Sequence, residues 1–181
     1  DTAGVNLASM NYHFGSKVQL FEAAIQYAAA PINAERIRQL DTLEAAPGLP
    51  TVAQLVRAFV DVNIIGGDLA WPQLIARIFA EPSSLSKSQL ERLFSPTVQR
   101  FLQALQRSLP DLDPAQLGLR FYFLVGAMLH LNRFSSPRMF TGPARPEDSK
   151  EQLIDELVNF AVAGLCQPPS KNNSRKGDRI G

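Results

Sequence analysis

The sequence predicts an all-α protein, and two observations support this fold class. At five places a residue that favours the N-terminal cap of a helix stands three positions before a glutamine, and an apolar stretch with helical spacing follows. Such pairs form capping boxes, in which two side chains satisfy free backbone N–H groups of the first turn. The pairs are Ser16–Gln19, Thr51–Gln54, Ser86–Gln89, Asp113–Gln116 and Ser149–Gln152. The alternating pattern of a half-buried strand is nearly absent from the chain.

The first two long helices are predicted at residues 16–43 and 51–65, each with an apolar face along its length. Pro31 lies inside the first helix, where it removes one helical hydrogen bond, so we expect a kink there. Residues 45–50 are rich in proline and glycine and form the predicted linker between the two helices. A glycine pair ends the second helix.

The remaining helices follow the same periodic pattern. They are predicted at residues 71–80, 86–109, 114–134 and 149–165. Pro96 is expected to bend the second of these helices. Helix 114–134 is apolar on two sides, so we expect it to be buried on two sides. Residues 135–148 contain three prolines and a glycine and indicate a long loop, and the polar, basic residues 168–181 indicate a flexible tail.

The composition describes a well-packed protein with little net charge. Hydrophobic residues make up 45% of the 181 residues, and the net charge is +1. No global basic field therefore indicates nucleic acid, although a small basic head on an acidic body remains compatible with DNA binding. The single cysteine, Cys166, cannot form an internal disulfide, which fits a reducing cytoplasm. No apolar run reaches the roughly 18 residues of a transmembrane helix, so no membrane partner is expected.

The stretch that organises the chain is AGVNLASMNYHFGSKVQLF at residues 3–21. Gly4 allows a tight turn, and Asn6 can cap a short helix over residues 7–14. Gly15 breaks this helix just before the first long one begins. A short helix with polar side chains, held between two turns and joined to a long helix, is typical of the second helix of a helix-turn-helix.

The run GVNLASMNYHFGSK resembles the recognition-helix signature of TetR-type transcriptional regulators, which is close to G-V-S-x-G-T-L-Y-x-H/Y-F-x-S-K. The residues that match in register are Gly4, Val5, Ser9 (for threonine), His13, Phe14, Ser16 and Lys17. The departures are Leu7, Ala8 and above all Asn11, which stands where the family usually has tyrosine. About two helices precede this signature in the family, so the resemblance implies that the DNA-binding head is incomplete in this sequence.

The resemblance implies that the short helix and the start of the long one bind DNA. The residues expected at the DNA are Asn6, Leu7, Ser9, Asn11, Tyr12, His13 and Lys17. Lys17 lies in the first turn of its helix, where backbone N–H groups and its ammonium can share a phosphate. The alternative reading makes Tyr12, His13 and Phe14 ordinary core residues at a helix end.

Patterns that carry catalysis or bind metals are missing from the sequence. The histidines are His13 and His130, which lie in separate elements, and no HExxH, GxSxG, P-loop or GxGxxG pattern occurs. With one cysteine and two histidines, a Cys/His metal site is not expected. We therefore expect neither an enzyme nor a protein with a cofactor or a metal ion.

The helical body contains many aromatic and flexible apolar side chains, which can enclose an apolar small molecule with a few polar groups to orient it. The candidate pocket residues are Phe59, Asn63, Trp71, Arg77, Phe79, Phe94, Phe101, Phe121, Tyr122, Met128 and His130. The alternative is that each of them is a core residue. The resemblance favours the pocket, because TetR-type proteins use this body to bind an effector that moves their DNA-binding heads apart.

The sequence and the resemblance together predict three parts. Residues 1–44 form a partial helix-turn-helix domain with its connecting helix, residues 45–167 an effector-binding and dimerisation domain, and residues 168–181 a tail. The last two helices are apolar over more of their circumference than one partner would cover, so we expect a homodimer through them. The expected function is a repressor that binds a double-stranded DNA operator and is released by a small apolar effector; the alternative is a dimeric ligand-binding or interaction module without DNA binding.

Overall fold

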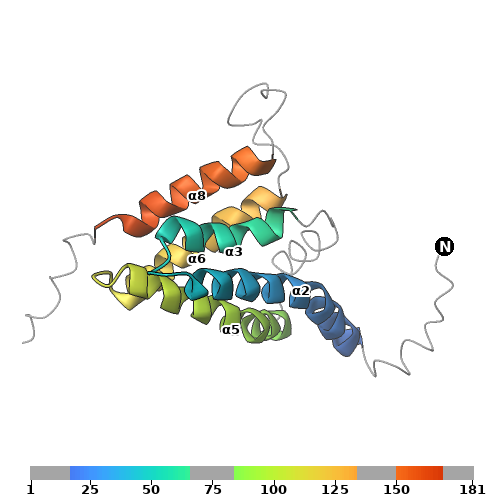
Figure 1. Cartoon of the computed structure of the whole chain (residues 1–181). Helices are drawn as coiled ribbons and strands as arrows, with labels where there is room; N and C mark the ends of the chain where they lie inside the picture. Colours follow the sequence, from blue (N-terminus) through green and yellow to red (C-terminus); the bar gives the residue numbers. More distant parts are fainter. Residues whose placement is uncertain (1–16, 66–83, 134–149, 169–181) are drawn as a thin grey trace, which may run out of the picture.

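A computed structural model gives the fold, and it describes residues 17–65, 84–133 and 150–168. The described part is all-α, as predicted, and Figure 1 shows its five helices. They are α2 (Lys17–Ala45), α3 (Val52–Ile65), α5 (Ser84–Ser108), α6 (Pro114–Arg133) and α8 (Lys150–Cys166). Each ends within two residues of its predicted limits. The predicted short helices at 7–14 and 71–80, the loop at 135–148 and most of the tail lie outside the described residues.

Capping contacts confirm two of the predicted helix starts. At the start of α3, the backbone N–H of Thr51 donates to Gln54 Oε1 (2.8 Å), and the backbone N–H of Gln54 donates to Thr51 Oγ1 (3.2 Å). Asp113 Oδ1 caps α6 by accepting from the backbone of Ala115 and Gln116, at 3.0 and 3.1 Å. The predicted cap at Ser86 is wrong, because α5 already begins two residues earlier.

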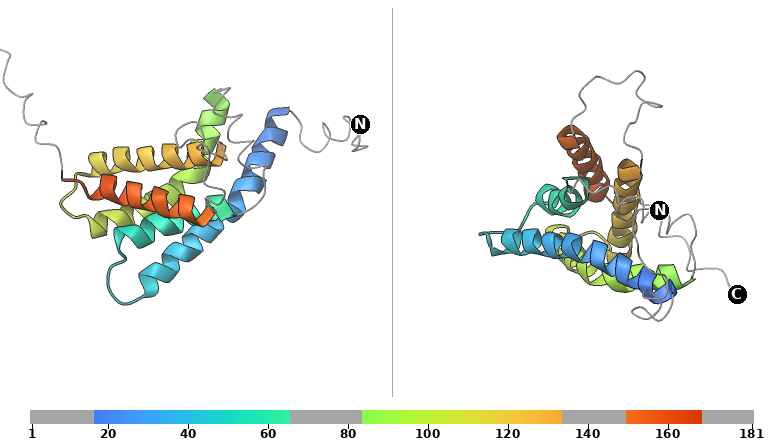
Figure 2. Two further views of the ribbon diagram at one scale, coloured as in Figure 1. Left: turned by 90° about the horizontal axis from the view of Figure 1, so that it is seen from above. Right: turned by 90° about the vertical axis from the view of Figure 1, so that its right-hand side faces the viewer.

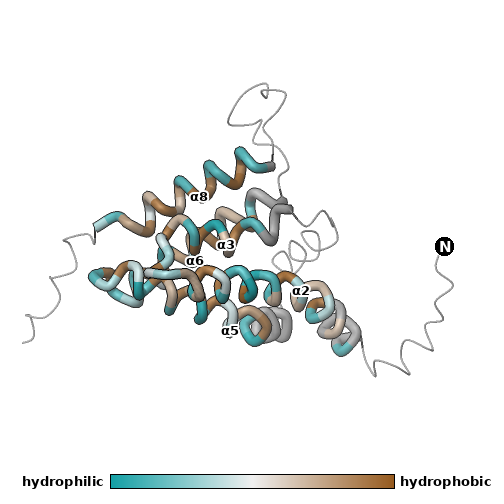
Figure 3. The backbone as a smooth tube through the Cα atoms, viewed as in Figure 1, coloured by the Kyte–Doolittle hydropathy of each residue, from teal (hydrophilic) through white to brown (hydrophobic). Residues whose placement is uncertain are grey.

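Helix α3 is the centre of the bundle and contacts each of the other four described helices. Figure 1 shows α3 between α8 and α2, and the views of Figure 2 show α5 and α6 closing the other sides. Apolar and polar residues alternate along every helix in Figure 3, so each helix turns one stripe inward. The largest fully buried side chains include Leu40 of α2, Phe59 of α3 and Phe101 of α5.

Helix α2 continues through Pro31 and changes direction along its course, which agrees with the predicted kink (Figures 1 and 2). Beyond the proline, its buried side includes Arg36 and Leu40. Asn33 Nδ2 also donates to the carbonyl of Leu93 in α5, at 3.0 Å. The C-terminal half of α2 is therefore part of the core.

Only one of the two apolar sides of α6 is covered within the described part of the chain. Phe121, Leu124 and Met128 are buried, whereas Tyr122 and Phe123 are 69% and 59% exposed. The predicted burial of the second side is therefore not provided by the described part of a single chain. Neighbouring residues of a helix point about 100° apart, so Phe121 and Tyr122 cannot both face the same core.

Candidate functional site

Three phenylalanines from three helices meet in the middle of the bundle. We call Phe59 of α3, Phe101 of α5 and Phe121 of α6 the aromatic cluster. The ring of Phe59 lies 5.1 Å from that of Phe101 and 4.8 Å from that of Phe121, with interplanar angles of 72° and 65°. These are edge-to-face contacts, the arrangement that the ring quadrupoles favour. All three residues were candidate pocket residues, and the structure brings them together.

A buried arginine from α2 covers the aromatic cluster. The guanidinium carbon of Arg36 lies 3.9 Å from the ring centroid of Phe59. Its Nε donates a hydrogen bond to the backbone carbonyl of Phe59 (2.9 Å), and its Nη2 lies 3.5 Å from Met128 Sδ. Arg36 is 2% exposed and is the only buried charged residue in the described ranges. It therefore joins α2, α3 and α6 at one point.

The position of Arg36 follows from its register in α2. Ile25, Ala29 and Leu40 are buried on this helix, and Arg36 stands four residues before Leu40 and seven after Ala29. Spacings of four and seven keep residues on one face of a helix. Arg36 was not among the predicted site residues, although a charged residue on an otherwise apolar helix stripe is a signal that could have identified it.

The charge of Arg36 has no counter-charge among the residues that the structure describes. Burial lowers the pKa of its guanidinium to about 9, so the side chain still carries its charge at neutral pH. A guanidinium has five N–H donors, and the contacts with Phe59 and Met128 use two of them. The acceptors in both contacts are neutral. Within the described residues, the charge is thus hydrogen-bonded only in part and has no opposite charge beside it.

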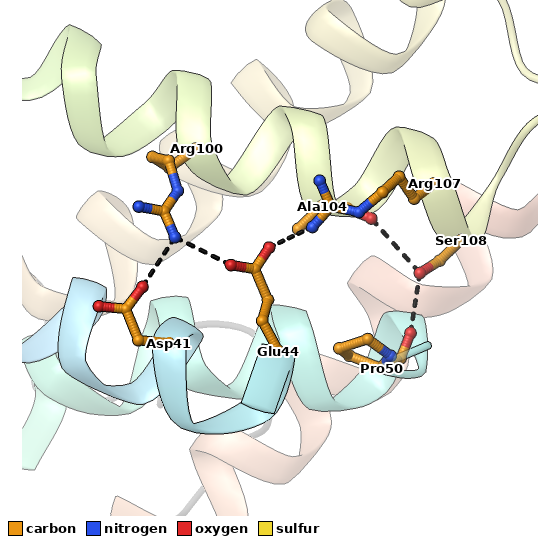
Figure 4. A network of polar contacts seen from close by, with 7 residues as sticks. All are labelled: Asp41, Glu44, Pro50, Arg100, Ala104, Arg107 and Ser108. Atoms are coloured by element: carbon orange, nitrogen blue, oxygen red, sulfur yellow. Dashed lines mark hydrogen bonds and ion pairs between the residues drawn. The ribbon is translucent and has the colours of Figure 1, made fainter. Parts of the chain in front are cut away.

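Other arginines of the protein contrast with Arg36, because they are partly exposed and paired with carboxylates. Arg100 Nη2 lies 2.7 Å from Asp41 Oδ1 and 2.9 Å from Glu44 Oε2, and Arg107 also pairs with Glu44. We call these four residues the polar network; Figure 4 shows it linking α2 to α5. Next to it, Ser108 Oγ donates to the carbonyl of Pro50, at 2.8 Å. The C-terminal half of α2 is therefore fixed to α5.

Two candidate pocket residues lie away from the aromatic cluster. Tyr122 is 69% exposed and His130 is also exposed, so the prediction that they line a site inside the single chain is not supported. The reason is helical geometry: Tyr122 is about 100° from Phe121, and His130 about 200° from Met128, around the axis of α6. Met128 itself is buried against Arg36.

The other candidate residues are described only in part. Phe94 is partly buried in α5. The side chain of Asn63 in α3 is not described, and Trp71, Arg77 and Phe79 lie outside the described residues. Their place in a pocket stays a prediction.

The predicted DNA-binding residues fall almost entirely outside the described part of the chain. This applies to Asn6, Leu7, Ser9, Asn11, Tyr12 and His13. Lys17 is the first residue of α2, and its side chain is not described. The same helix carries Arg36 nineteen residues later, roughly 28 Å along the axis if it were straight. One helix thus connects the end of the predicted DNA-binding stretch to the buried arginine.

The described ranges show neither a metal-binding cluster nor a membrane-spanning helix. They contain no group of three or more histidine, cysteine, aspartate or glutamate residues placed to hold a metal ion. No helix within them combines the length and apolar character needed to cross a membrane.

Comparison with known protein families gives a match over more than half of the chain. Residues 53–164 match the family model described as "Tetracyclin repressor-like, C-terminal domain". The matched range starts in α3, ends in α8 and includes the aromatic cluster. No curated protein sequence matches the chain.

Proposed function

The chain belongs to the TetR family of regulators, and we propose that it is a transcriptional repressor that binds a DNA operator as a homodimer and releases it when a small apolar effector binds. The observation that carries the proposal is the continuity of α2. This helix begins at Lys17, the last residue of the sequence run that resembles a recognition helix, and its later half packs into the matched domain through Arg36. A regulator, rather than an enzyme, is the role that family membership supports.

The effector site proposed here is the region around the aromatic cluster, Arg36 and Met128. Aromatic and flexible apolar side chains with one polar group to orient a ligand are the usual lining of small-molecule sites. Phe94 extends this lining along α5, because it stands seven residues before Phe101 and so on the same side of the helix. Asn63, Trp71, Arg77 and Phe79 are proposed to complete it.

The proposed release mechanism acts through α2. An effector that displaces Arg36 from the Phe59 carbonyl would change how α2 lies against α3, and the N-terminal end of α2 would move with it. Such a ligand shifts the equilibrium only by its difference in affinity for the two arrangements. To move the population from about 99% DNA-bound to about 99% released, the affinities of the effector for the two arrangements must differ by about 10⁴-fold.

The proposed dimer uses the exposed apolar residues of α6 and α8. Leu119, Tyr122 and Phe123 follow one another at helical spacing on α6 and are more than half exposed, and Phe160 of α8 is 70% exposed. Gly126 continues this side of α6 by one turn, with open space in front of it. Two copies related by a twofold axis would cover these residues in an isologous four-helix bundle.

The DNA-binding residues proposed are those of the sequence analysis, with Lys17 as a phosphate contact. In the protein with its complete DNA-binding head, Lys17→Ala should weaken binding to operator and non-operator DNA by a similar factor. It should also lower the slope of log K against log salt by about 1, because one phosphate contact is lost. Gel shifts or fluorescence anisotropy at several salt concentrations measure both quantities.

A matched control variant tests whether the effect on DNA binding is particular to Lys17. Arg38→Ala removes a charge from an exposed face of the same helix, where the side chain pairs with Glu35. It should leave the salt slope unchanged. If Lys17→Ala and Arg38→Ala behave alike, Lys17 does not contact phosphate. If the protein with a complete head binds no DNA fragment specifically, it is a dimeric ligand-binding module instead.

A further inference from the structure

We infer that the effector is an apolar molecule carrying a single carboxylate group, and that Arg36 binds this carboxylate. The inference rests on the proposed function in one respect: it takes the aromatic cluster to be part of the effector site. It goes beyond that function by stating the charge and the chemical class of the ligand.

The free-energy cost of burying the charge of Arg36 is the first reason to expect a carboxylate ligand. A charge taken out of water is costly unless a counter-charge or a full set of hydrogen bonds compensates for it. Arg36 is 2% exposed, and the atoms that it contacts in the described residues are a backbone carbonyl, a thioether sulfur and an aromatic ring. None of these carries a negative charge. A ligand with a carboxylate would supply the counter-charge that these contacts lack.

The second step is the geometry of the donors that remain. Phe59 covers one face of the guanidinium and its carbonyl accepts from Nε, whereas Met128 lies near Nη2. The hydrogen bonds of the guanidinium to described residues come from Nε and Nη2, and none of them comes from Nη1. A carboxylate can accept two N–H groups of a guanidinium at once, so it fits this edge.

The third step concerns the rest of the ligand. Arg36 is the only buried charge in the described part of the chain, and its surroundings there are aromatic and aliphatic. A monocarboxylate would be neutralised by this one cation. A phosphate or a dicarboxylate would bring excess negative charge into an apolar environment, which is unfavourable. The body attached to the carboxylate should therefore be an alkyl chain or an aromatic ring.

The test compares acids with their neutral amides. Octanoate, decanoate and 4-phenylbutyrate are each titrated into the protein at neutral pH by calorimetry, in parallel with the corresponding primary amides. At least one acid should bind, at least tenfold more tightly than its amide. Arg36→Met, which keeps an unbranched apolar side chain but not the charge, should weaken binding of that acid at least tenfold and leave the acid and the amide equal.

Two further variants separate binding from folding. Arg38→Met removes a charge two residues away on the exposed side of α2 and should bind the acid like the unchanged protein. Arg36→Lys keeps the charge without the two-pronged donor edge and should bind the acid with intermediate affinity. If Arg36→Met fails to fold, two results still show whether Arg36 binds the carboxylate. They are the comparison of acid with amide on the unchanged protein and the affinity of Arg36→Lys for the acid.

Three results would overturn the inference: no acid binds, acid and amide bind equally to the unchanged protein, or Arg36→Met binds the acid as well as the unchanged protein does. A gel shift with the same compounds tests the proposed function separately. If the amides release DNA as well as the acids do, the proposed repressor function is supported and the inference of a carboxylate ligand is wrong. If an acid binds through Arg36 but the protein binds no operator, the inference of a carboxylate ligand is supported and the proposed repressor function is wrong.

Discussion

At the scale of single residues, Phe59 carries most of the contacts that define the aromatic cluster. Its ring touches those of Phe101 and Phe121 and the guanidinium of Arg36. Phe59→Ala should lower the free energy of unfolding by about 3–5 kcal/mol, because it removes a buried ring and leaves a cavity. Tyr27→Ala is the control: Tyr27 is 85% exposed, so its loss should change stability by less than about 0.5 kcal/mol. Urea unfolding followed by circular dichroism measures both, and equal effects would contradict the packing described here.

Asp61 gives a prediction about pH. Burial raises the pKa of its carboxyl, and the nearby Asp155 and Glu151 add to this, whereas Arg57, 3.8 Å away, opposes it. A carboxyl whose pKa is raised on folding disfavours the folded state while the carboxyl is ionised. This free-energy cost is present above the folded pKa. It disappears as pH falls through the folded pKa towards the unperturbed value of 3.8. Asp61→Asn should therefore stabilise the protein by a few tenths of a kcal/mol at neutral pH.

The pH dependence distinguishes this cause from a simple change in packing. Below the pKa of a free aspartate, the carboxyl is protonated in both states, so Asp61→Asn and the unchanged protein should then unfold at the same urea concentration. Glu156→Gln, a change at an exposed residue of α8, serves as the control and should have little effect in this pH range. A stabilising effect of Asp61→Asn that persists at low pH would rule out the electrostatic cause.

Single residues also mark the limits of prediction from sequence. Phe59, Phe101, Phe121 and Met128 could be identified as site candidates because their type and their helical spacing indicate inward positions. Arg36 was not singled out, because a charge is normally expected at the surface, and only its register against Ala29 and Leu40 reveals that it is buried. Tyr122 and His130 are exposed in the single chain, because residue type alone does not state which side of a helix a residue occupies.

At the scale of elements, helix limits are the best-predicted feature. They depend on local chemistry, such as the capping of α3 by Thr51 and Gln54, which the sequence contains in full. The start of α5 was missed by two residues because serines stand at both 84 and 86, and their residue type does not state which lies nearer the helix start. The contacts between helices, such as the polar network, could not be predicted, since they join residues more than fifty positions apart.

The polar network gives the prediction at this scale. Glu44 pairs with both Arg100 and Arg107, and its side chain is only 26% exposed, so it joins α2 to α5 at two points (Figure 4). Glu44→Gln should lower the free energy of unfolding by about 1 kcal/mol at low salt, and less at 1 M salt, where ion pairs are screened. Glu35→Gln breaks an ion pair within α2 alone and should cost less than Glu44→Gln at low salt, because an exposed pair within one helix contributes little. Equal losses in the two variants would show that the pairing with α5 adds nothing.

At the scale of the whole molecule, the described helices leave apolar side chains exposed on one side of the bundle. α3 is enclosed by the other helices, whereas α6 and α8 leave large apolar side chains exposed. Exposed apolar surface of this kind marks an interaction site in most soluble proteins. The sequence could predict this surplus, because helix 114–134 is apolar on two sides, but it could not say which side packs inward.

Phe123→Glu tests whether a second copy covers this side. Phe123 is 59% exposed and lies between Leu119 and Gly126 at helical spacing on α6. In a twofold dimer the substitution occurs twice in one interface, and two buried carboxylates without partners should weaken association at least about 100-fold. Sedimentation or light scattering should then show a dimer for the unchanged protein and a monomer for Phe123→Glu. Tyr27→Glu places the same charge on an exposed aromatic position of α2 and should leave the dimer intact. If Phe123→Glu remained a dimer while Tyr27→Glu dissociated, subunits would associate through α2, and the operator geometry proposed here would have to change with the interface.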